Sequence, residues 1–515
     1  MVQYAAIRKG SNVEGINRRG FLMGSVATGV VGGALASDVK PLRARAVGEK
    51  PTVALIGMGC QMMGVLLGQF LGQDVLIVAA CDCDKARREN AARKINDVYK
   101  ARKLGEICRA EADWRKIVAD PGIDMVCVAT PDHWHATITV AALKAGKDVY
   151  CEKPLTYNID EAKRVMAASA KYGRIVQCGA MQRSSVEFRS ACEIVRNGLI
   201  GEVKECDCSF GGPSGPHRFF DKPADAAKEG APNPDVDWDM WLGPSIYTPY
   251  SDQLSPRGPC KTYPMFWRYD DYFGSGACGD WGAHHLDIAQ WGLDKDGESP
   301  VKVVASTAPH SADPKHGGRR QCGLTIVYGD GKRINHVPGG WFTTVFYGTD
   351  GIVACARNRF ALWLGKGVAP DATVRKAISE GTFDGMRKIG FWNVNPWSLK
   401  NNPKYKIAPA CDKSMLDALN KGIKAVDLKN AKLKLYKTAA GHVDDFVKCF
   451  HSRQQPCSCA EVGCHSAILC QMCNTSYMYD SGFDWDPATD TFANGTGDPH
   501  WLGRQYFRNG WEIGS

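Results

Sequence analysis

Short apolar runs alternate with longer helical stretches across residues 51–179. The first run, Pro51–Ile56, leads through a glycine-containing turn into the helical stretch Met62–Leu71, and the next run, Val75–Cys81, ends at Asp82. Strands that are separated by helices run parallel, and a parallel sheet needs helices on both of its faces. The pattern therefore predicts an α/β domain over residues 51–179. Its later strands are expected at Met125–Ala129, Asp148–Cys151 and Ile175–Cys178, and its later helices at Ala136–Ala145 and Asp160–Tyr172.

The character of the sequence changes after this first domain. Residues 180–515 hold strand-like runs with few helices between them, which indicates an α+β domain with a large, open and mainly antiparallel sheet. Residues 211–271 are rich in proline, glycine and aromatic residues, which is typical of a functional loop, and residues 365–435 resemble an insertion. The expected strands are Glu202–Phe210, Val301–Thr307, Cys322–Val327, Arg333–Val337 and Thr343–Phe346, and helix returns at Ala439–Tyr479.

The N-terminus has the features of an export signal. Arg18 and Arg19 precede an apolar, Gly- and Ala-rich run that ends at Ala36 and is too short to anchor in a hydrocarbon core of about 30 Å. Small residues at alternate positions predict cleavage after Ala36 or Ala46. We expect residues 1–46 to be a twin-arginine signal with its linker, and the mature protein to be periplasmic or otherwise exported. A disordered basic tail is the alternative interpretation.

The overall composition excludes several classes of protein. The chain has 515 residues, of which 44% are hydrophobic and 23% charged, so we expect two globular domains rather than a disordered or fibrous protein. The net charge is +9, but residues 1–46 contribute seven basic and only two acidic side chains, so the remainder is weakly basic. Runs of lysine and arginine interleaved with aromatic residues are absent, which predicts no nucleic-acid partner. No later segment approaches ~18 consecutive apolar residues, so no membrane span is expected in the mature form.

The 21 cysteines all follow the proposed signal. Cys457, Cys459, Cys470 and Cys473 have spacings at which thiolates could hold zinc. However, Ala467–Met478 has the pattern of a helix, in which Cys470 and Cys473 would pack as small hydrophobic residues. We therefore predict no metal site.

A dinucleotide site is predicted at the first turn. Gly57 and Gly59 stand directly between the first strand and the first helix, where glycines let the backbone turn tightly and approach a pyrophosphate. The third glycine of the common fingerprint would fall at Met62, and the nearest glycine is Gly64. Asp82 can accept hydrogen bonds from an adenosine ribose and would repel a 2′-phosphate, so we expect NAD, with NADP as the alternative. The cations that could instead bind the phosphate of NADP are Lys85, Arg87 and Arg88.

Lys153 is the first candidate for catalysis. It follows Glu152 at the carboxyl end of a predicted strand, the edge at which open α/β sheets bind ligands. A lysine there can relay the proton of a substrate hydroxyl while hydride leaves the same carbon, and a neighbouring carboxylate would tune its pKa. Asp280 and His284 are four residues apart, so on one helical turn their side chains would converge on the same hydroxyl. The alternative interpretations are a solvated lysine, a capping aspartate and a buried structural histidine.

Several motifs taken together resemble one family. In their order along the chain, they are similar to the Gfo/Idh/MocA oxidoreductases. The motifs are Val53–Gly64, Thr130–His135, Gly146–Leu155 and Asp280–Asp287. The likeness is strongest over residues 51–210, and further segments, Asp237–Pro244 and His442–Pro487, are similar to exported members. The departures are Met62 in the glycine fingerprint, the insertion after residue 365 and the cysteine content.

The resemblance implies roles for individual residues. Lys153, in its Glu-Lys-Pro motif, would be the catalytic proton-transfer residue, and Asp280 and His284 would complete the catalytic group. It also implies a homo-oligomer, which in this family often forms through the open sheet. The residues expected at the cofactor are Gly57, Gly59, Gly64, Asp82, Thr130, Pro131, His135 and Glu152. The residues expected at the substrate are Gln182, Arg183 and His285.

The combined interpretation is an NAD(P)-dependent sugar or cyclitol dehydrogenase. It would transfer hydride between nicotinamide and a secondary hydroxyl of a saccharide, cyclitol or glycoside. One alternative is an NAD-dependent glycosidase or lyase, in which transient oxidation acidifies a neighbouring C–H bond and permits elimination without net redox change. Another is a non-catalytic sugar-binding protein, but three candidate catalytic residues argue against it because binding alone does not require them.

Replacing both Arg18 and Arg19 by lysine is expected to retain the precursor in the cytoplasm. Lysine keeps the charge but lacks the planar guanidinium with its five donors, so it does not reproduce the paired motif. Immunoblots of cytoplasmic and periplasmic fractions measure the effect, with Arg8→Lys as a control outside the motif. Unchanged periplasmic accumulation of the double variant would contradict the assignment.

Overall fold

The structure is a computed structural model that describes most of the chain from residue 48 onwards. The described residues are 40, 48–213, 233–259, 266–313, 316–367, 370–385, 387–393, 413–435, 441–503, 508 and 511. The predicted export signal and part of the predicted insertion lie outside them. Within these ranges, no helix combines the length and the apolar character of a transmembrane span.

Six strands form the first sheet, and every neighbouring pair is parallel. Their order, β3-β2-β1-β4-β5-β6, is that of a doubly wound Rossmann domain and confirms the predicted α/β fold. The strand order reverses between β1 and β4, and ligands bind at the carboxyl ends of the strands at such a point. The strands are β1 Thr52–Ile56, β2 Leu76–Cys81, β3 Arg109–Glu111, β4 Met125–Val128, β5 Asp148–Cys151 and β6 Val176–Cys178. The helices are α1 Leu67–Leu71 after a π-helical turn at Met62–Leu66, α2 Lys85–Ala101, α3 Trp114–Ala119, α4 His135–Lys144 and α5 Ile159–Tyr172.

Local signals explain where these elements begin and end. The central strands β4 and β5 are buried at every position, as expected when helices cover both faces of a sheet. The side chain of Asp84 accepts a hydrogen bond from Arg87 N at the start of α2, and that of Asn158 caps α5 in the same way. Helix α5 ends at Gly173, which has a φ of 58° and so adopts the left-handed conformation that glycine favours.

Ten strands form the second sheet, which is large, open and mainly antiparallel as predicted. Its order is β14-β13-β12-β11-β7-β10-β9-β8-β15-β16, and among the described strands only β7 and β10 pair in parallel. Residues 387–393 form the edge strand β14, although we expected that region to be an insertion of mixed helix and loop. The strands are β7 Val203–Ser209, β8 Lys302–Val304, β9 Thr325–Val327, β10 Arg333–Val337, β11 Thr344–Gly348, β12 Gly351–Ala356, β13 Arg359–Leu364, β14 Arg387–Asn393, β15 Phe483–Asp486 and β16 Thr491–Ala493.

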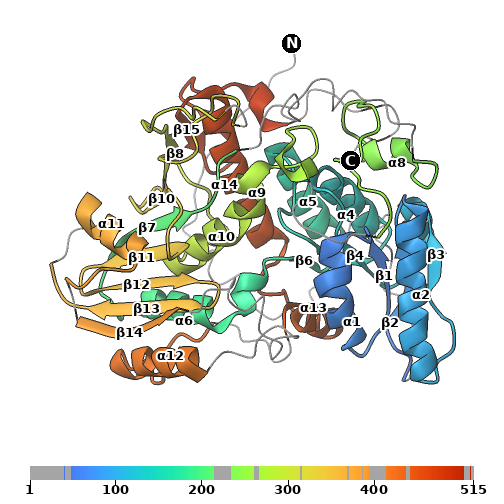
Figure 1. The fold of residues 1–515 in the computed structure, drawn as a ribbon, viewed down its shortest axis with the longest axis horizontal. Coiled ribbons are helices and arrows are strands. Elements are labelled where there is room, and N and C mark those ends of the chain that lie inside the picture. The colour runs from blue at the N-terminus through green and yellow to red at the C-terminus, as the bar shows by residue number, and fades with distance from the viewer. Residues whose placement is uncertain are drawn as a thin grey trace, which may run out of the picture. The chain divides into compact units, whose positions relative to one another are not determined.

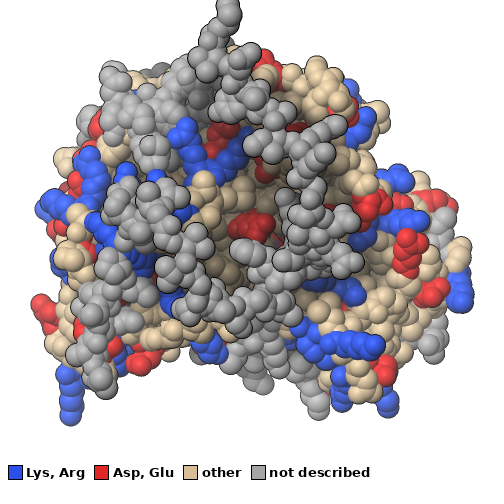
Figure 2. Space-filling model, turned by 180° about the vertical axis from the view of Figure 1, so that it is seen from behind, with Lys and Arg blue, Asp and Glu red and all other residues tan. Residues whose placement is uncertain are grey.

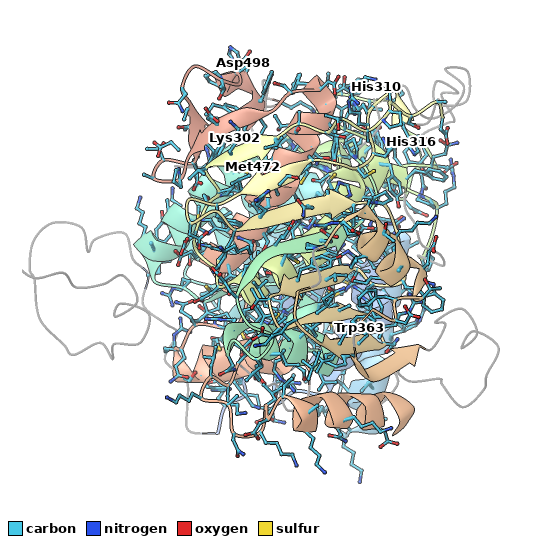
Figure 3. All side chains as sticks on the ribbon, turned by 90° about the vertical axis from the view of Figure 1, so that its left-hand side faces the viewer. Lys302, His310, His316, Trp363, Met472 and Asp498 are labelled. Carbon is cyan, nitrogen blue, oxygen red and sulfur yellow. The ribbon has the colours of Figure 1, made fainter. Side chains whose placement is uncertain are left out.

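Helices cover the two faces of this sheet unequally. Helices α6 (Val186–Arg196) and α10 (Gly282–Leu293) pack against the face that is turned towards the Rossmann half (Figure 1). The outer face, onto which Figure 3 looks, carries α11 (Ala372–Glu380) over an apolar cluster that includes Trp363 of β13. Towards the other end of the same face, Lys302 of β8 is exposed. The sheet therefore has one fully packed face and one face that is only partly covered.

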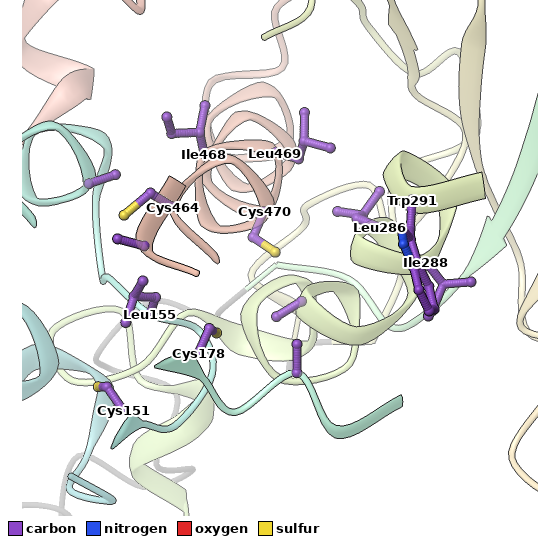
Figure 4. Packing of buried hydrophobic residues seen from close by; sticks show 14 of the residues in the cluster. Cys151, Leu155, Cys178, Leu286, Ile288, Trp291, Cys464, Ile468, Leu469 and Cys470 are labelled. Carbon is purple, nitrogen blue, oxygen red and sulfur yellow. The ribbon is translucent and has the colours of Figure 1, made fainter. Parts of the chain in front are cut away.

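Helix α14 (Ala460–Tyr479) joins the Rossmann half to the second sheet. It packs against α5 on one side and against α10 on the other (Figure 1). Figure 4 shows Cys470 of this helix between Cys178 of β6 and Leu286 of α10, and all three residues belong to one buried hydrophobic cluster. The backbone of α14 comes very close to β6 at Gly463, where an added Cβ would lie 2.6 Å from the Cβ of Cys178. The two halves consequently share one hydrophobic core.

Helix α13 (His442–Ser452) returns to complete the core of the Rossmann half. Phe446 is fully buried there, and its ring makes an edge contact with Tyr150 of β5, which in turn contacts Phe70 of α1. The side-chain amide of Gln177 in β6 donates a hydrogen bond of 2.7 Å to the carbonyl oxygen of His442. The domain boundary that we expected near residue 179 therefore leaves α13 outside the first domain, although α13 covers one face of the first sheet.

Charged side chains of both signs occur on the surface. On the face drawn in Figure 2, basic and acidic residues are found side by side over the described surface, and acidic side chains lie in a hollow near the centre of the view. Exposed pairs such as Lys302 with Asp484, 3.2 Å apart, contribute little stability individually because water screens them. Hydrophobic packing therefore dominates the stability of the fold.

Phe446→Ala is expected to destabilise the protein by about 3–5 kcal/mol, because it removes a fully buried ring and leaves a cavity under the Rossmann sheet. Thermal unfolding followed by calorimetry measures the change. Tyr247→Ala is the matched control, since that aromatic side chain is 71% exposed. Equal melting temperatures for the Phe446 variant and the parent would show that α13 is not needed for the stability of this half.

Candidate functional site

One cavity of about 870 Å³ lies along the carboxyl ends of β1, β2, β4 and β5. It continues to α9 (Gly276–Asp280), to α10 and to the turn between β12 and β13. This is the edge at which a doubly wound sheet binds its ligand. The predicted residues that line it are Gly57, Gly59, Asp82, Thr130, Pro131, His135, Glu152, Lys153, Gln182, Asp280 and His284. The predicted residues that do not line it are Gly64, Arg183 and His285.

The turn after β1 requires glycine at its first position. Gly57 has a φ of 88°, and an added Cβ would lie 2.7 Å from backbone atoms of Ala129 and Thr130. Nothing lies within 4 Å of a Cβ built on Gly59, so a ligand has room to approach the backbone there. Met62, at the third position of the fingerprint, is fully buried in the core beneath the sheet. Gly64 lies on the following helical turn and does not take the place of the third glycine.

Asp82 connects the end of β2 to this turn. Its Oδ2 accepts a hydrogen bond of 2.7 Å from Met58 N, and its Oδ1 accepts one of 2.8 Å from Asp84 N. These bonds fix the carboxylate at the rim of the cavity, where an adenosine ribose would lie. Arg87 is already held by Asp84 and by the carbonyl oxygen of Pro256, at 3.3 and 2.6 Å. Arg88 donates to the carbonyl oxygen of Asp82 itself. These two cations are therefore engaged by the protein, which favours NAD over NADP.

The polar groups of this region fit a dinucleotide. The hydroxyl oxygen of Thr130 is buried at the edge of the cavity and has no hydrogen-bond partner among the described residues. Buried hydroxyl groups are normally bonded, so an unpartnered one beside an open glycine turn indicates a ligand position. The residues that would hold NAD are Gly57, Gly59, Asp82 and Thr130.

Lys153 and Asp280 meet at the far end of the cavity. The Nζ atom of Lys153 donates to the carbonyl oxygen of Asp280 at 2.8 Å and forms an ion pair with its carboxylate. Arg268 is a second cation at this carboxylate, with its Nε 3.4 Å from Oδ1. Burial alone would raise the pKa of Asp280, but the two cations outweigh it and hold the pKa below its usual value. Asp280 is consequently ionised and orients the ammonium group of Lys153.

Glu152 accepts hydrogen bonds from Gln61 and from the backbone of Lys153. Its Oε1 accepts a hydrogen bond of 3.0 Å from the side chain of Gln61, and its Oε2 accepts one of 3.3 Å from the backbone N of Lys153. Burial raises the pKa of Glu152, and the charge of Lys153 only partly offsets this effect. A Cβ added to Gly179 would lie 2.8 Å from the carboxyl carbon, so glycine is required beside it. Glu152 thus links Gln61, which follows the glycine turn, to Lys153.

The two histidines that line the cavity differ in their surroundings. Burial, followed by the nearby charges of Arg357 and Lys153, lowers the pKa of His284 far below its usual value, so the ring is neutral. Its Nδ1 has no hydrogen-bond partner within the described part of the chain. The ring of His135 instead lies between two carbonyl oxygens, those of Pro154 at 2.7 Å and Thr130 at 3.0 Å. His284 is therefore available to a substrate, whereas His135 positions the backbone around the site.

Arg183 and His285 lie behind the cavity. Arg183 is fully buried and forms ion pairs of 2.7 Å with both Asp287 and Asp296. The Nδ1 of His285 lies 2.6 Å from the carbonyl oxygen of Ser209, and burial lowers its pKa to about 3. Consecutive side chains on a helix point about 100° apart, and on α10 it is His284, not His285, that lines the cavity. The structure therefore does not bring these two residues to the expected substrate position.

Some cavity residues were not found from the sequence. Arg268 and Tyr269 belong to the segment rich in aromatic residues that was expected to be a functional loop, but nothing singled them out within it. Trp281, which is 41% exposed, separates α9 from α10 and also lines the cavity. Arg357 comes from a turn of the second sheet and had no sequence signal. These residues become neighbours only through the packing of the two halves.

The described residues contain no group of three or more His, Cys, Asp or Glu side chains that could hold a metal ion. Cys60 is disulfide-bonded, and the other described cysteines are free thiols, most of them buried. Cys470 and Cys473 are completely buried on α14, where they pack in the core. Cys470 and Cys473 therefore pack as small hydrophobic residues, which was the alternative to a zinc site.

Comparison with known proteins identifies the family. Residues 52–180 match the family model described as an oxidoreductase family with an NAD-binding Rossmann fold, named GFO_IDH_MocA. Residues 193–339 match the model of the C-terminal alpha/beta domain of the same oxidoreductase family. The two ranges together take up more than half of the chain. The chain belongs to the Gfo/Idh/MocA oxidoreductase family. NAD is accordingly the cofactor of its first domain.

Similar proteins include several dehydrogenases of this family. Levoglucosan dehydrogenase of Pseudarthrobacter phenanthrenivorans is 31% identical over 224 residues, which cover 43% of this chain and 45% of that protein. Inositol 2-dehydrogenase 1 of Saccharopolyspora erythraea is 33% identical over 152 residues, which cover 29% and 42%. Both matches span less than half of the relative's own length. The solved NAD-binding protein from Listeria innocua shares the fold, with a TM-score of 0.52, 16% identity, and coverage of 85% of this chain and 97% of that chain.

Asp82→Ala is expected to weaken NAD binding by roughly 10-fold or more, because hydrogen bonds to a charged group contribute about 1.5–3 kcal/mol. The variant should also lose preference for NAD over NADP, since the carboxylate that repels a 2′-phosphate is gone. Fluorescence titration with NADH and NADPH measures both effects, and Asp74→Ala on the exposed surface is the matched control. Tighter binding of NADPH than NADH by the parent protein would show that Asp82 has been assigned wrongly.

Proposed function

We propose that this protein oxidises a secondary hydroxyl group of a saccharide, cyclitol or glycoside. The observation that carries the proposal is the Lys153–Asp280 pair, which stands with a neutral His284 at the end of a cavity whose other end fits NAD. In the reaction, the C–H bond of the carbinol carbon breaks with both electrons, the O–H bond loses its proton, and a ketone forms. NAD, when bound, supplies the acceptor for the hydride.

Lys153 is proposed to hold the substrate hydroxyl and to transfer its proton. An ammonium group has three N–H donors, and the described contacts of Lys153 Nζ are both to Asp280. The third proton of the ammonium group leaves to solvent before the reaction, so that the lone pair of the Lys153 amine can accept the proton of the substrate hydroxyl. The ammonium group that forms again is stabilised by Asp280. His284 is neutral and its Nδ1 is unpartnered among the described residues, so its ring can share the hydroxyl proton. Asp280 keeps Lys153 in place through its carbonyl oxygen and its carboxylate.

We also propose that the chain is exported after it has folded. Twin-arginine transport carries folded proteins, which would let NAD bind before export. The many buried free thiols agree with this order, because they would be protected inside a finished core before they reach an oxidising compartment. Burial raises the pKa of Cys178, for example, well above its usual value, so little reactive thiolate is present.

Lys153→Met is expected to lower turnover by about 10²- to 10⁴-fold while NAD binding is retained, because it removes the group that transfers the proton. NADH formation with a panel of sugars and cyclitols gives the turnover, and a separate NADH titration gives the binding. Lys163→Met, on the partly exposed face of α5, is the matched control. Near-parental turnover by the Lys153 variant with bound NAD would overturn the mechanism.

Product analysis distinguishes this proposal from a reaction that passes through transient oxidation. A dehydrogenase forms one equivalent of NADH for each ketone. A glycosidase or lyase releases an eliminated group and returns the cofactor unchanged, so mass spectrometry of the products together with absorbance at the NADH band separates the two. Elimination without net NADH formation would replace the dehydrogenase proposal.

A further inference from the structure

Arg357 is placed at the cavity by a hairpin of the second sheet. The last backbone pair of β12 and β13 is Ala356 with Arg359, so Arg357 and Asn358 form the turn between these strands. Asn358 has a φ of 60°, and its backbone N donates a hydrogen bond of 3.2 Å to Oε1 of Glu187. The turn is therefore held in one conformation, and both of its residues line the cavity.

The guanidinium of Arg357 lies among groups at the substrate end. Its central carbon is 4.9 Å from the centre of the Trp281 ring, on the ring face. When the amide of Gln182 is turned to satisfy both of its polar atoms, its oxygen accepts a hydrogen bond of 3.2 Å from Arg357 Nε, and its nitrogen donates to the carbonyl oxygen of His284. The charge of Arg357 lowers the pKa of His284 more than that of Lys153 does. Arg357 thus stands beside the proposed reaction centre.

Arg357 differs from the other arginines of the cavity because no carboxylate pairs with it. Arg87 has Asp84 at 3.3 Å, and Arg268 has Asp280 at 3.4 Å. Among the described residues, no acidic oxygen lies within ion-pair distance of Arg357. Arg357 is exposed, and it lines the cavity.

The acidic residues near Arg357 interact with other groups. Asp280 is matched by two cations, Lys153 and Arg268. Glu187 accepts from the backbone of the turn, and burial raises its pKa, as it does for Glu152. The substrate end of the cavity therefore has a positive charge that the described side chains leave without a paired anion.

We propose that Arg357 forms a carboxylate-binding subsite and that the substrate is a sugar acid. This inference rests on the proposed oxidation of a sugar hydroxyl and specifies its substrate class. With Nε bonded to Gln182, the two terminal nitrogens of the planar guanidinium have no hydrogen-bond partner among the described residues and would be able to bind both oxygens of a carboxylate in the cavity. Trp281 would pack against the carbon ring of the same substrate, since aromatic faces offer a large apolar contact.

The first experiment compares matched acidic and neutral substrates. We expect the parent protein with NAD to oxidise D-glucuronate or D-galacturonate with a higher kcat/KM than D-glucose or D-galactose. Arg357→Gln should reduce kcat/KM for the acids by roughly 10- to 100-fold more than it reduces kcat/KM for the neutral sugars, and the additional loss should appear mainly in KM. Arg357→Lys should give an intermediate loss, because it keeps the charge without the paired donors.

Arg359→Gln is the matched control from the same hairpin. Arg359 donates to the carbonyl oxygen of Trp341 at 2.6 Å, stacks on that ring, and does not line the cavity. It should leave the ratio of acidic to neutral kcat/KM unchanged. NADH titration checks that each variant keeps its cofactor site.

A binding measurement separates this proposal from the proposed function. Calorimetric titration of D-glucuronate into Lys153→Met with NADH should detect binding, and the additional change Arg357→Gln should weaken it by roughly 10-fold or more. If neutral sugars are preferred and Arg357→Gln alters neither binding nor kcat/KM, the carboxylate subsite is wrong, while a loss of turnover in Lys153→Met would still support the oxidation. A preference for sulfated over carboxylated sugars that depends on Arg357 would overturn the assignment of a sugar acid.

Discussion

The ion pair between Lys153 and Asp280 connects the two halves of the molecule at the candidate active site. Lys153 follows β5 of the Rossmann half and Asp280 ends α9 in the other half, so neither half alone contains a complete site. The side chains are only 12% and 19% exposed, and losing either partner would leave a charge in poorly solvated surroundings. Any shift of one half against the other would therefore change the charges at this end of the cavity as well as the position of a ligand bound there.

The packing around α14 explains how this pair can be held in place. A charge pair needs its two backbones fixed to within a fraction of an ångström to be useful in catalysis, and flexible linkers between domains do not provide that. Here Gly463 lets α14 approach β6 without a side chain between them, while the opposite side of the helix packs on α10. The contact between Lys153 and Asp280 is thus held by a continuous apolar core that the two halves share, rather than by the ion pair itself.

The sequence predicted those parts of the site that depend on local patterns. Gly57, Asp82 and Lys153 stand at the ends of strands in a regular strand–helix alternation, so their meeting at one sheet edge follows from the topology. The sequence could not show that His285 and Arg183 lie outside the cavity. The rotation of α10 turns His285 towards Ser209, and a buried ion pair with Asp287 holds Arg183. The position of Arg357 depends on a hairpin in a different sheet. Such long-range placements result from packing between distant segments, and periodicity carries no information about them.

The return of α13 to the Rossmann half has a consequence for how the protein is made. The strands of the first sheet are complete at residue 178, but α13 is synthesised only at residues 442–452. On the ribosome, N-terminal domains usually fold as soon as they emerge. In this chain the surface around Phe70 and Tyr150 would stay uncovered until nearly the whole polypeptide has appeared. The nascent chain would therefore expose an aggregation-prone apolar surface during most of translation. Chaperones that bind such surfaces would then determine what fraction of the chains reaches the folded state.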